Sequence, residues 1–282
     1  MTNQIKTVFL MVLLAVLIMT IGQILGGAKG VAVAFVISLV MNLGAYWFSA
    51  DIVLAKSKAK VVGPGEAPQL YQLVEHLAGR AGLPTPKVAI VGDPTPNAFA
   101  TGRNPKHAVV AVTQGLLNMM SREELAGVLG HELTHVKHRD ILIGSIVAVM
   151  ASAIMFAANL AKFGAVFRGS YRNRGGFNPI VVLLLAVLAP LAACLIQAAV
   201  SRSREYLADD GGADIAGSSM GLATALEKLE RTAQGSGGPV GATPETASLY
   251  IVNPLSARSF AGLFSTHPPT QERIARLRGL RP

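Results

Sequence analysis

The most informative stretch of the chain is residues 121–135, which read SREELAGVLGHELTH. Ser121 is followed three residues later by Glu124, a pair typical of the capping box that begins a helix. Apolar residues then recur at helical spacing. The stretch therefore predicts a helix over residues 122–140.

On such a helix, His131 and His135 lie on one face because they are four residues apart. Two imidazoles placed in this way can bind one Zn²⁺ ion at about 2.0–2.1 Å. Glu132, beside the first histidine, can then take a proton from the attacking water. This H-E-x-x-H spacing is typical of zinc peptidases. The alternative is a solvated helix face with two unrelated histidines, and the capping box and the apolar periodicity argue against it.

A catalytic zinc site needs a third protein ligand. The motif variant with a glycine and a third histidine just downstream is excluded, because Lys137 and Ile141 occupy those positions. The candidate segment is residues 201–210, SRSREYLADD, in which Glu205 and Asp209 are four residues apart. One of them could bind the metal while the other accepts a hydrogen bond from a ligand histidine. The spacing alone fits a charged, solvated helix equally well.

The composition indicates a membrane protein. The chain has 282 residues, of which 51% are hydrophobic and 15% charged, against about 25% charged in an ordinary soluble domain. A single cysteine, Cys194, excludes a disulfide scaffold. Long windows without any charged residue exclude a disordered chain.

Four uncharged windows each reach the length of about 20 residues that a helix needs to cross a bilayer. The sequence therefore predicts a mainly α integral membrane protein with four transmembrane helices and a cytoplasmic α+β domain that carries the zinc helix. That domain is expected from two parts of the chain, residues 51–140 and 202–282. The predicted spans are residues 7–28, 30–50, 141–161 and 175–201.

Basic residues set the expected orientation. Most of those flanking the windows fall on one side, which the positive-inside rule assigns to the cytoplasm. The net charge of +9 is explained in the same way, and no nucleic-acid partner is expected. A second basic cluster between the last two windows leaves open a tilted or shallow hairpin there. The cytoplasmic flanks are Lys6, Lys56, Lys58, Lys60, Lys137, Arg139, Arg202 and Arg204, and the opposite group is Lys29, Lys162, Arg168, Arg172 and Arg174.

In the rest of the expected cytoplasmic domain, the pattern of apolar residues predicts short strands and amphipathic helices. Strands are expected at residues 88–91 and 108–112, with an edge strand at 97–102. Helices are expected at residues 67–79, 220–232 and 270–280, and a glycine-rich loop at 235–241.

Three motifs together resemble the HtpX family of membrane metallopeptidases, a group that also includes the prenyl-protein endopeptidases. They are HELTH at residues 131–135, SRSREYLAD at 201–209 and STHPPT at 265–270. The resemblance covers the whole chain. It implies a zinc endopeptidase of the bacterial inner membrane, with its active site facing the cytoplasm. Its expected substrates are misfolded or damaged membrane proteins.

The resemblance also implies roles for individual residues. Glu205 matches the third zinc ligand and Asp209 its supporting carboxylate. His267 matches a histidine that helps to bind the substrate or the oxyanion. The segment matching the substrate-binding edge strand includes Asn97, Ala98, Phe99 and Ala100.

Topology also favours Glu205 over His267 as the third ligand, because a membrane hairpin would return Glu205 beside the zinc helix. Two other functions remain open: cleavage of prenylated proteins, and a non-catalytic membrane scaffold. An intact Glu132 argues against the scaffold. The remaining histidines, His76, His107 and His138, are expected to be structural or solvated.

Overall fold

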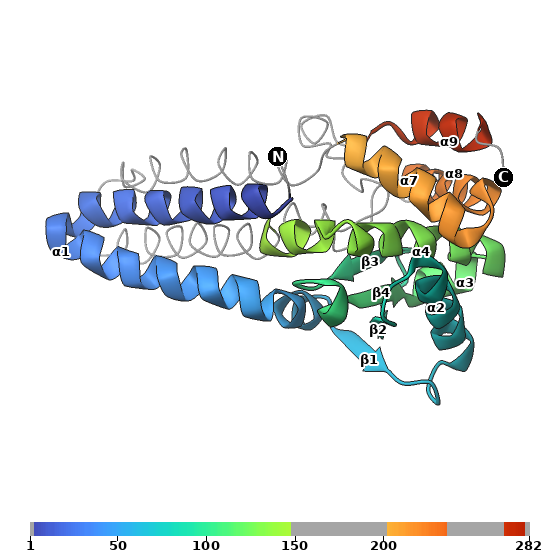
Figure 1. Ribbon diagram of the computed structural model, residues 1–282, viewed down its shortest axis with the longest axis horizontal. Coiled ribbons are helices and arrows are strands. Elements are labelled where there is room, and N and C mark those ends of the chain that lie inside the picture. Colours follow the sequence, from blue (N-terminus) through green and yellow to red (C-terminus); the bar gives the residue numbers. More distant parts are fainter. Residues whose placement is uncertain (1–2, 148–201, 236–267, 280–282) are drawn as a thin grey trace, which may run out of the picture.

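The computed structural model describes residues 3–147, 202–235 and 268–279 (Figure 1). A long helical arm extends from one end of an α+β unit that contains the H-E-x-x-H motif at residues 131–135. The predicted third span beyond residue 147, the predicted fourth span and His267 lie outside the described residues.

Helix α1, Asn3–Lys56, is folded back on itself at Gly26 and Gly27. Gly27 has φ 56° and ψ −141°, a conformation that glycine adopts without steric cost. Next to this turn the two arms approach so closely that a Cβ on Gly30 would lie 2.0 Å from the carbonyl oxygen of Gly22. The turn lies two residues before Lys29, which separates the two predicted spans, and the second arm continues past residue 50 to Lys56.

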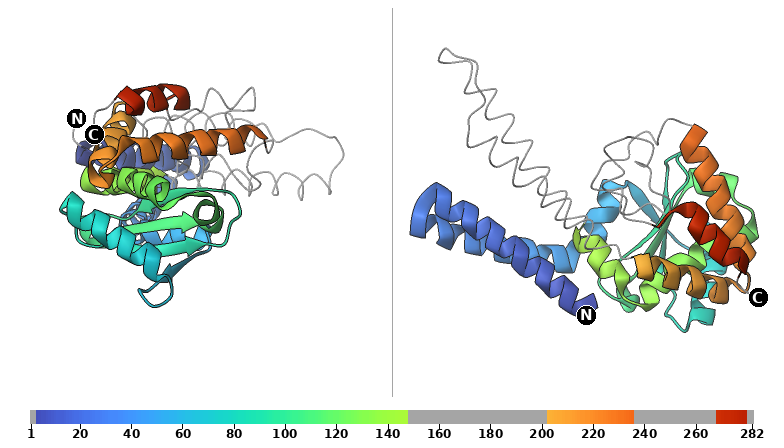
Figure 2. Two further views of the ribbon diagram at one scale, coloured as in Figure 1. Left: turned by 90° about the vertical axis from the view of Figure 1, so that its right-hand side faces the viewer. Right: turned by 90° about the horizontal axis from the view of Figure 1, so that it is seen from above.

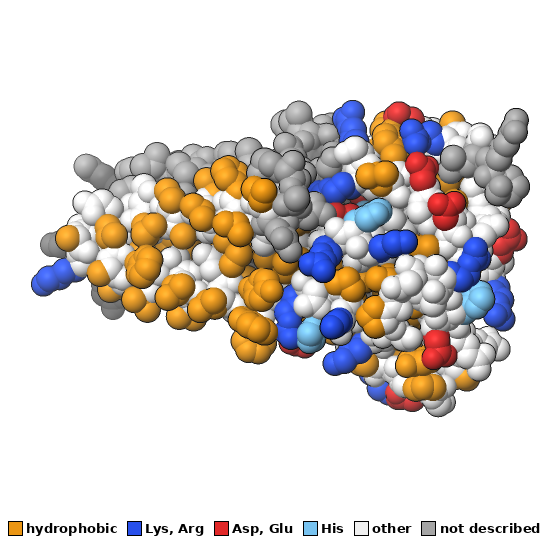
Figure 3. Space-filling model, in the orientation of Figure 1, with side chains coloured by type: hydrophobic (Ala, Val, Ile, Leu, Met, Phe, Trp, Pro, Cys, Tyr) orange, Lys and Arg blue, Asp and Glu red, His pale blue; other side chains and the backbone are white. Residues whose placement is uncertain are grey.

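The surface of α1 is apolar. Its second arm, Gly26–Lys56, is the one helix among the described residues that is long and apolar enough to cross a membrane, and Thr7–Thr20 is a shorter apolar helix. Large apolar side chains such as Val40 and Phe48 are 66% and 60% exposed. Figure 3 shows hydrophobic side chains, in orange, over the visible face of the arm. So many exposed apolar side chains on one helix would favour aggregation in water. They are suited to contact with lipid.

The α+β unit contains a four-stranded sheet in the order β1-β2-β4-β3. Strands β2 and β4 are parallel, whereas β1 and β3 pair antiparallel at the two edges. The bounds are β1 Ala59–Val62, β2 Lys87–Val91, β3 Ala98–Thr101 and β4 Val109–Thr113.

Three of these strands agree with the sequence prediction, including the edge position of β3. Strand β1 was not predicted, because its lysine Lys60 and the preceding Lys58 belong to the basic flank of the second span. The segment pairs along β2, with Ala59 opposite Val91, and Val61 and Val62 favour the strand conformation although Lys60 does not.

Helices cover the two faces of the sheet unequally. One face packs on α2 and α4, and the other receives the end of α1 through Val53 and Leu54. On the far side of α4 lie α7 and α8, and α9 packs on these two (Figure 1 and Figure 2). The bounds are α2 Pro68–Ala81, α3 Gln114–Met119, α4 Arg122–Lys137, α7 Arg202–Ala216, α8 Ser219–Gly235 and α9 Thr270–Gly279.

The predicted capping box begins α4. The Ser121 hydroxyl accepts a hydrogen bond from the Glu124 backbone N–H at 3.3 Å, and the Glu124 carboxylate accepts one from the Ser121 N–H at 2.8 Å. The same carboxylate binds the Lys228 ammonium at 2.7 Å. One glutamate thus begins α4 and also attaches α8 to it.

The predicted end of α4 was wrong. The helix ends at Lys137 rather than at residue 140, because Arg139 adopts a left-handed conformation with φ 59°. Residues 140–147 then form a separate helical segment. The zinc helix therefore does not continue straight into the apolar window.

Glycines bring α4 and α7 into backbone contact. A Cβ on Gly130 would lie 2.6 Å from the Gly212 carbonyl oxygen, and one on Gly212 would lie 2.7 Å from the His131 nitrogen. These distances are shorter than any real Cβ contact, so larger residues would force the helices apart. The close approach places α7 within side-chain reach of the two histidines.

Candidate metal centre

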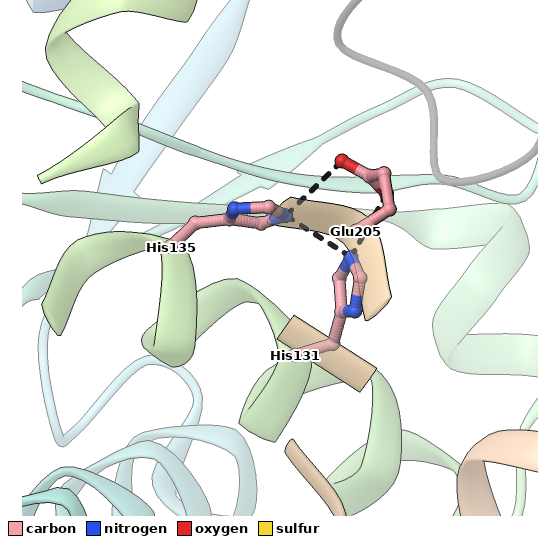
Figure 4. A group of neighbouring side chains, drawn as sticks. All are labelled: His131, His135 and Glu205. Atoms are coloured by element: carbon pink, nitrogen blue, oxygen red, sulfur yellow. Dashed lines mark hydrogen bonds and ion pairs between the residues drawn. The ribbon is translucent and has the colours of Figure 1, made fainter. Parts of the chain in front are cut away.

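The two histidines of α4 point their Nε2 atoms at a common point (Figure 4). His131 and His135 lie one turn apart, and their Nε2 atoms are 3.2 Å apart. His131 is 2% exposed. His131 is therefore almost fully shielded from water. The two Nε2 atoms are close enough to bind one ligand between them.

Glu205 reaches the same point from α7 (Figure 4). Its carboxylate oxygens lie 3.7 Å from Nε2 of His131 and 3.6 Å from Nε2 of His135. Ligands of a tetrahedral metal at 2.0–2.1 Å are separated by about 3.4 Å. The three side chains therefore fit one metal ion of that size, and they are a group whose candidate ligand atoms lie within 4.8 Å of one another.

A carboxylate binds the second nitrogen of each histidine. The Nδ1 atom of His131 lies 3.0 Å from Oδ1 of Asp209, and that of His135 lies 3.0 Å from Oδ2 of Asp140. When Nδ1–H donates to a carboxylate, Nε2 is left with its lone pair free to bind a metal. In the neutral form of either ring, this acceptor favours the tautomer that leaves Nε2 free to bind a metal.

The charges around His135 favour a cation at this position. Burial alone would lower the pKa of His135, but the hydrogen bond to Asp140 and the charges of Glu205 and Glu132 raise it to about 9. His131 differs, since burial lowers its pKa despite the hydrogen bond to Asp209. The site therefore attracts positive charge, whether a proton or a metal ion.

Glu132 lies between the histidines and the edge of the sheet. Its Oε2 accepts a hydrogen bond from the Ala100 backbone N–H of β3 at 2.9 Å, and the residue is 6% exposed. Burial raises the pKa of Glu132 to about 7, and the neighbouring Glu205 adds to this effect. A carboxyl group with this pKa can accept and release a proton near neutral pH.

The predicted edge segment lies beside Glu132, but its side chains point to different faces. Ala98 packs in the core shared with α4, whereas Phe99 packs with Val53 and Leu54 of α1 on the opposite face. Asn97 is buried, and its backbone N–H donates to the Thr113 hydroxyl at 2.8 Å. The contact of this segment with Glu132 is made by the backbone N–H of Ala100.

The comparisons with known proteins agree with this geometry. The sequence pattern of peptidase family M48 matches residues 64–281. The chain belongs to peptidase family M48.

Two relatives resemble this M48 chain over nearly its whole length. A "Protease HtpX homolog" of Desulfatibacillum aliphaticivorans is 54% identical over 100% of this chain and 91% of that protein. One of Thermococcus kodakarensis is 54% identical over 97% of this chain and 94% of that protein. The expected resemblance to the HtpX family is thereby confirmed, and the chain is a membrane metalloprotease that acts on proteins.

The fold also resembles that of a solved structure. The crystal structure of Ste24p of S. mikatae matches with a TM-score of 0.52 at 20% identity, and the match covers 98% of this chain and 65% of that one. This M48 chain thus spans about two thirds of the length of Ste24p. At this identity the likeness concerns the fold alone.

The sequence did not reveal Arg273, a buried residue of α9. Its Nε and Nη2 donate to the two oxygens of Asp209 at 2.9 and 2.6 Å, and its Nη2 lies 3.5 Å from Nδ1 of His131. Burial would raise the pKa of Asp209, but the Arg273 guanidinium holds it below the usual range. Arg273 therefore keeps charged the carboxylate that positions His131. In the sequence, Arg273 lies six residues after His267 in a basic amphipathic helix, and this pattern does not indicate that its side chain is buried.

Replacing Arg273 with alanine is expected to lower the free energy of unfolding of the metal-free protein by about 3–5 kcal/mol, because Asp209 is left as a buried, unpaired charge. Thermal unfolding of the purified protein in detergent measures the loss. Arg276→Ala is the matched control, since Arg276 lies on the same helix and pairs with Asp210 at the surface. Equal melting temperatures for the two variants would contradict the expectation.

Proposed function

We propose that this chain is a zinc-dependent endopeptidase that cleaves misfolded or damaged membrane proteins at the cytoplasmic face of the bacterial inner membrane. The observation that carries the proposal is the convergence of His131, His135 and Glu205 beside the buried carboxylate of Glu132. Two histidines with one glutamate are a known ligand set of catalytic zinc sites.

In this proposal His131, His135 and Glu205 would bind the zinc ion. When bound, zinc would act as a Lewis acid and lower the pKa of the attacking water to about 7. Glu132 accepts the proton of the attacking water and later gives it to the leaving amine. The hydrogen bond from Ala100 holds this carboxylate in place at 2.9 Å. Asp209 keeps His131 in its metal-binding tautomer.

The substrate is proposed to bind as an additional strand along β3. In a strand, successive residues present their backbone groups to alternate edges. The Ala100 N–H points away from β4, because it donates to Glu132. Ala98, two residues earlier, presents its N–H and C=O to the same side. The groups proposed to pair with a substrate are thus the Ala98 N–H and C=O and the Ala100 C=O, and the side chain of His267 is proposed to assist at the oxyanion.

The position of the site relative to α1 supports membrane-attached substrates. The apolar arm ends at Lys56, and β1 begins three residues later. The Arg103 guanidinium after β3 lies 4.6 Å from the centroid of Trp47 on α1, and this contact holds the edge-strand region near the end of the arm. A cleavage site so close to an apolar arm would reach peptide bonds near a bilayer surface.

The decisive experiment compares purified wild-type protein with Glu132→Ala. Wild type is expected to contain about one zinc ion per chain and to cleave casein and detergent-solubilised membrane proteins, whereas Glu132→Ala is inactive. Equal cleavage by both proteins would overturn the assignment of the activity to a site in which Glu132 is the general base. A prenylated peptide is assayed in parallel, because selective cleavage of that peptide would favour the prenyl-protein endopeptidase alternative.

The proposed topology predicts opposite labelling of two cysteines introduced into a Cys194→Ser background. Gly65→Cys lies beyond the end of α1 and is expected to react only with reagents on the cytoplasmic side. Lys29→Cys lies at the turn of α1 and is expected to react only from the periplasmic side. Alkylation of intact cells with a membrane-impermeant maleimide separates the two cases. Labelling of Gly65→Cys from outside would overturn the topology.

A further inference from the structure

Asp140 lies against Nδ1 of His135, as Asp209 lies against Nδ1 of His131. Asp140 follows a break in the helix after α4. In a continuous helix, position 140 would lie about 140° around the axis from His135, on a different face. The left-handed residue Arg139, with φ 59°, interrupts the helix just before Asp140. The carboxylate then turns back, and its Oδ2 lies 3.0 Å from Nδ1 of His135.

Arg204 on α7 holds the other oxygen of this carboxylate. Its Nη1 lies 3.3 Å from Oδ1 of Asp140, and both side chains are largely buried, at 13% and 8% exposed. Arg204 directly precedes Glu205, so one helix supplies both the candidate ligand and the partner of Asp140. The contact therefore fixes α7 to the segment that follows α4.

The ion pair with Asp140 compensates the buried positive charge of Arg204. Its Nε and Nη2 atoms are buried and form no hydrogen bond in the described part of the chain. Asp140 is thus the carboxylate seen to compensate the buried guanidinium. An apolar residue at position 140 would leave His135 without its acceptor and Arg204 without its counter-charge.

We propose that Asp140 is a positioning residue for His135, equivalent to Asp209 for His131, and that Arg204 fixes Asp140 in its productive orientation. The two histidines would then be oriented by two independent buried ion pairs, Asp140–Arg204 and Asp209–Arg273. This inference rests on the proposed zinc site.

The test measures the metal affinity of Asp140→Asn and Asp140→Ala in the purified full chain. Zinc affinity is determined by competition with a chromogenic chelator, and Co²⁺ is added to record the visible spectrum of the bound ion. Loss of a carboxylate that orients a ligand histidine typically weakens metal binding 10–100-fold. Asp140→Ala is expected to show this loss together with a changed Co²⁺ spectrum. Asp140→Asn, which keeps an acceptor but not the charge, is expected to show a smaller loss.

Two further variants separate positioning from a general effect of charge or folding. Asp210→Asn makes the same chemical change on α7 at a surface pair and is expected to keep wild-type affinity. Arg204→Ala is expected to weaken zinc binding and to change the Co²⁺ spectrum in the same sense as Asp140→Asn. The melting temperature of each metal-free variant reports on folding independently.

Wild-type affinity and an unchanged Co²⁺ spectrum in Asp140→Ala would overturn the inference, as would an equal loss in Asp210→Asn. Either result would leave the proposed function intact if the wild-type protein binds zinc and cleaves protein. Failure of the wild-type protein to bind zinc would instead overturn the proposed function.

Discussion

Glu132→Gln is expected to lower peptide hydrolysis by about 10²–10⁴-fold while zinc stays bound. The histidines and Glu205 that would bind zinc are unchanged in this variant. The amide retains the acceptor for the Ala100 N–H, so the geometry around position 132 is preserved. It cannot accept the proton of water, however, and the general base is lost. Zinc content and the initial rate of casein cleavage are measured on the same purified sample.

The matched control is Glu123→Gln, on the same helix but exposed to solvent. It is expected to keep both zinc and the wild-type rate. A near-wild-type rate in Glu132→Gln would show that Glu132 is not the proton acceptor. Loss of zinc from Glu132→Gln would show that the carboxylate supports the metal site rather than the reaction.

Glu205→Ala is expected to abolish both zinc binding and activity. The carboxylate lies 3.6–3.7 Å from the two Nε2 atoms and is the candidate third ligand among the described residues. Without it, two histidines remain, and a catalytic zinc site ordinarily needs three protein ligands. Metal analysis after dialysis, together with the casein assay, measures the two losses.

His267→Phe provides the contrast, since this histidine is proposed to act on the substrate. It is expected to keep zinc and to lose mainly turnover. Asp209→Ala is expected to be intermediate, with zinc affinity weakened about 10–100-fold. Retention of zinc by Glu205→Ala and its loss from His267→Phe would reverse the assignment of the third ligand.

Local signals predicted the elements that carry the ligands. The capping box of Ser121 and Glu124 is complete within four residues. His131 and His135, which are four residues apart, share a face on any helix. The distance from Glu205 to these histidines follows from the pairing of α4 with α7. The four-residue spacing of Glu205 and Asp209 suggested one ligand and one supporting carboxylate. In the structure Oδ1 of Asp209 lies 3.0 Å from Nδ1 of His131.

The residues that could not be predicted depend on tertiary structure or on backbone strain. Arg273 is 142 residues from His131, and its burial arises only when α9 packs on α7 and α8. Asp140 reaches His135 because Arg139 departs from helical geometry, which helical periodicity cannot indicate. Strand β1 forms because β2 offers it an edge, and the lysines at and before position 60 obscured the strand preference of Val61 and Val62 in the sequence.

The separation between His131 and Arg273 also determines when the site can form during protein synthesis. A ribosome adds about 5–20 residues per second. The 142 residues between these two partners therefore take roughly 7 to 28 s to translate. During this interval the nascent chain carries the two histidines and Glu132 but not the arginine that sets the charge of Asp209. The buried cluster of His131, Asp209 and Arg273 can therefore form only after the segments on both sides of residues 148–201 have been made.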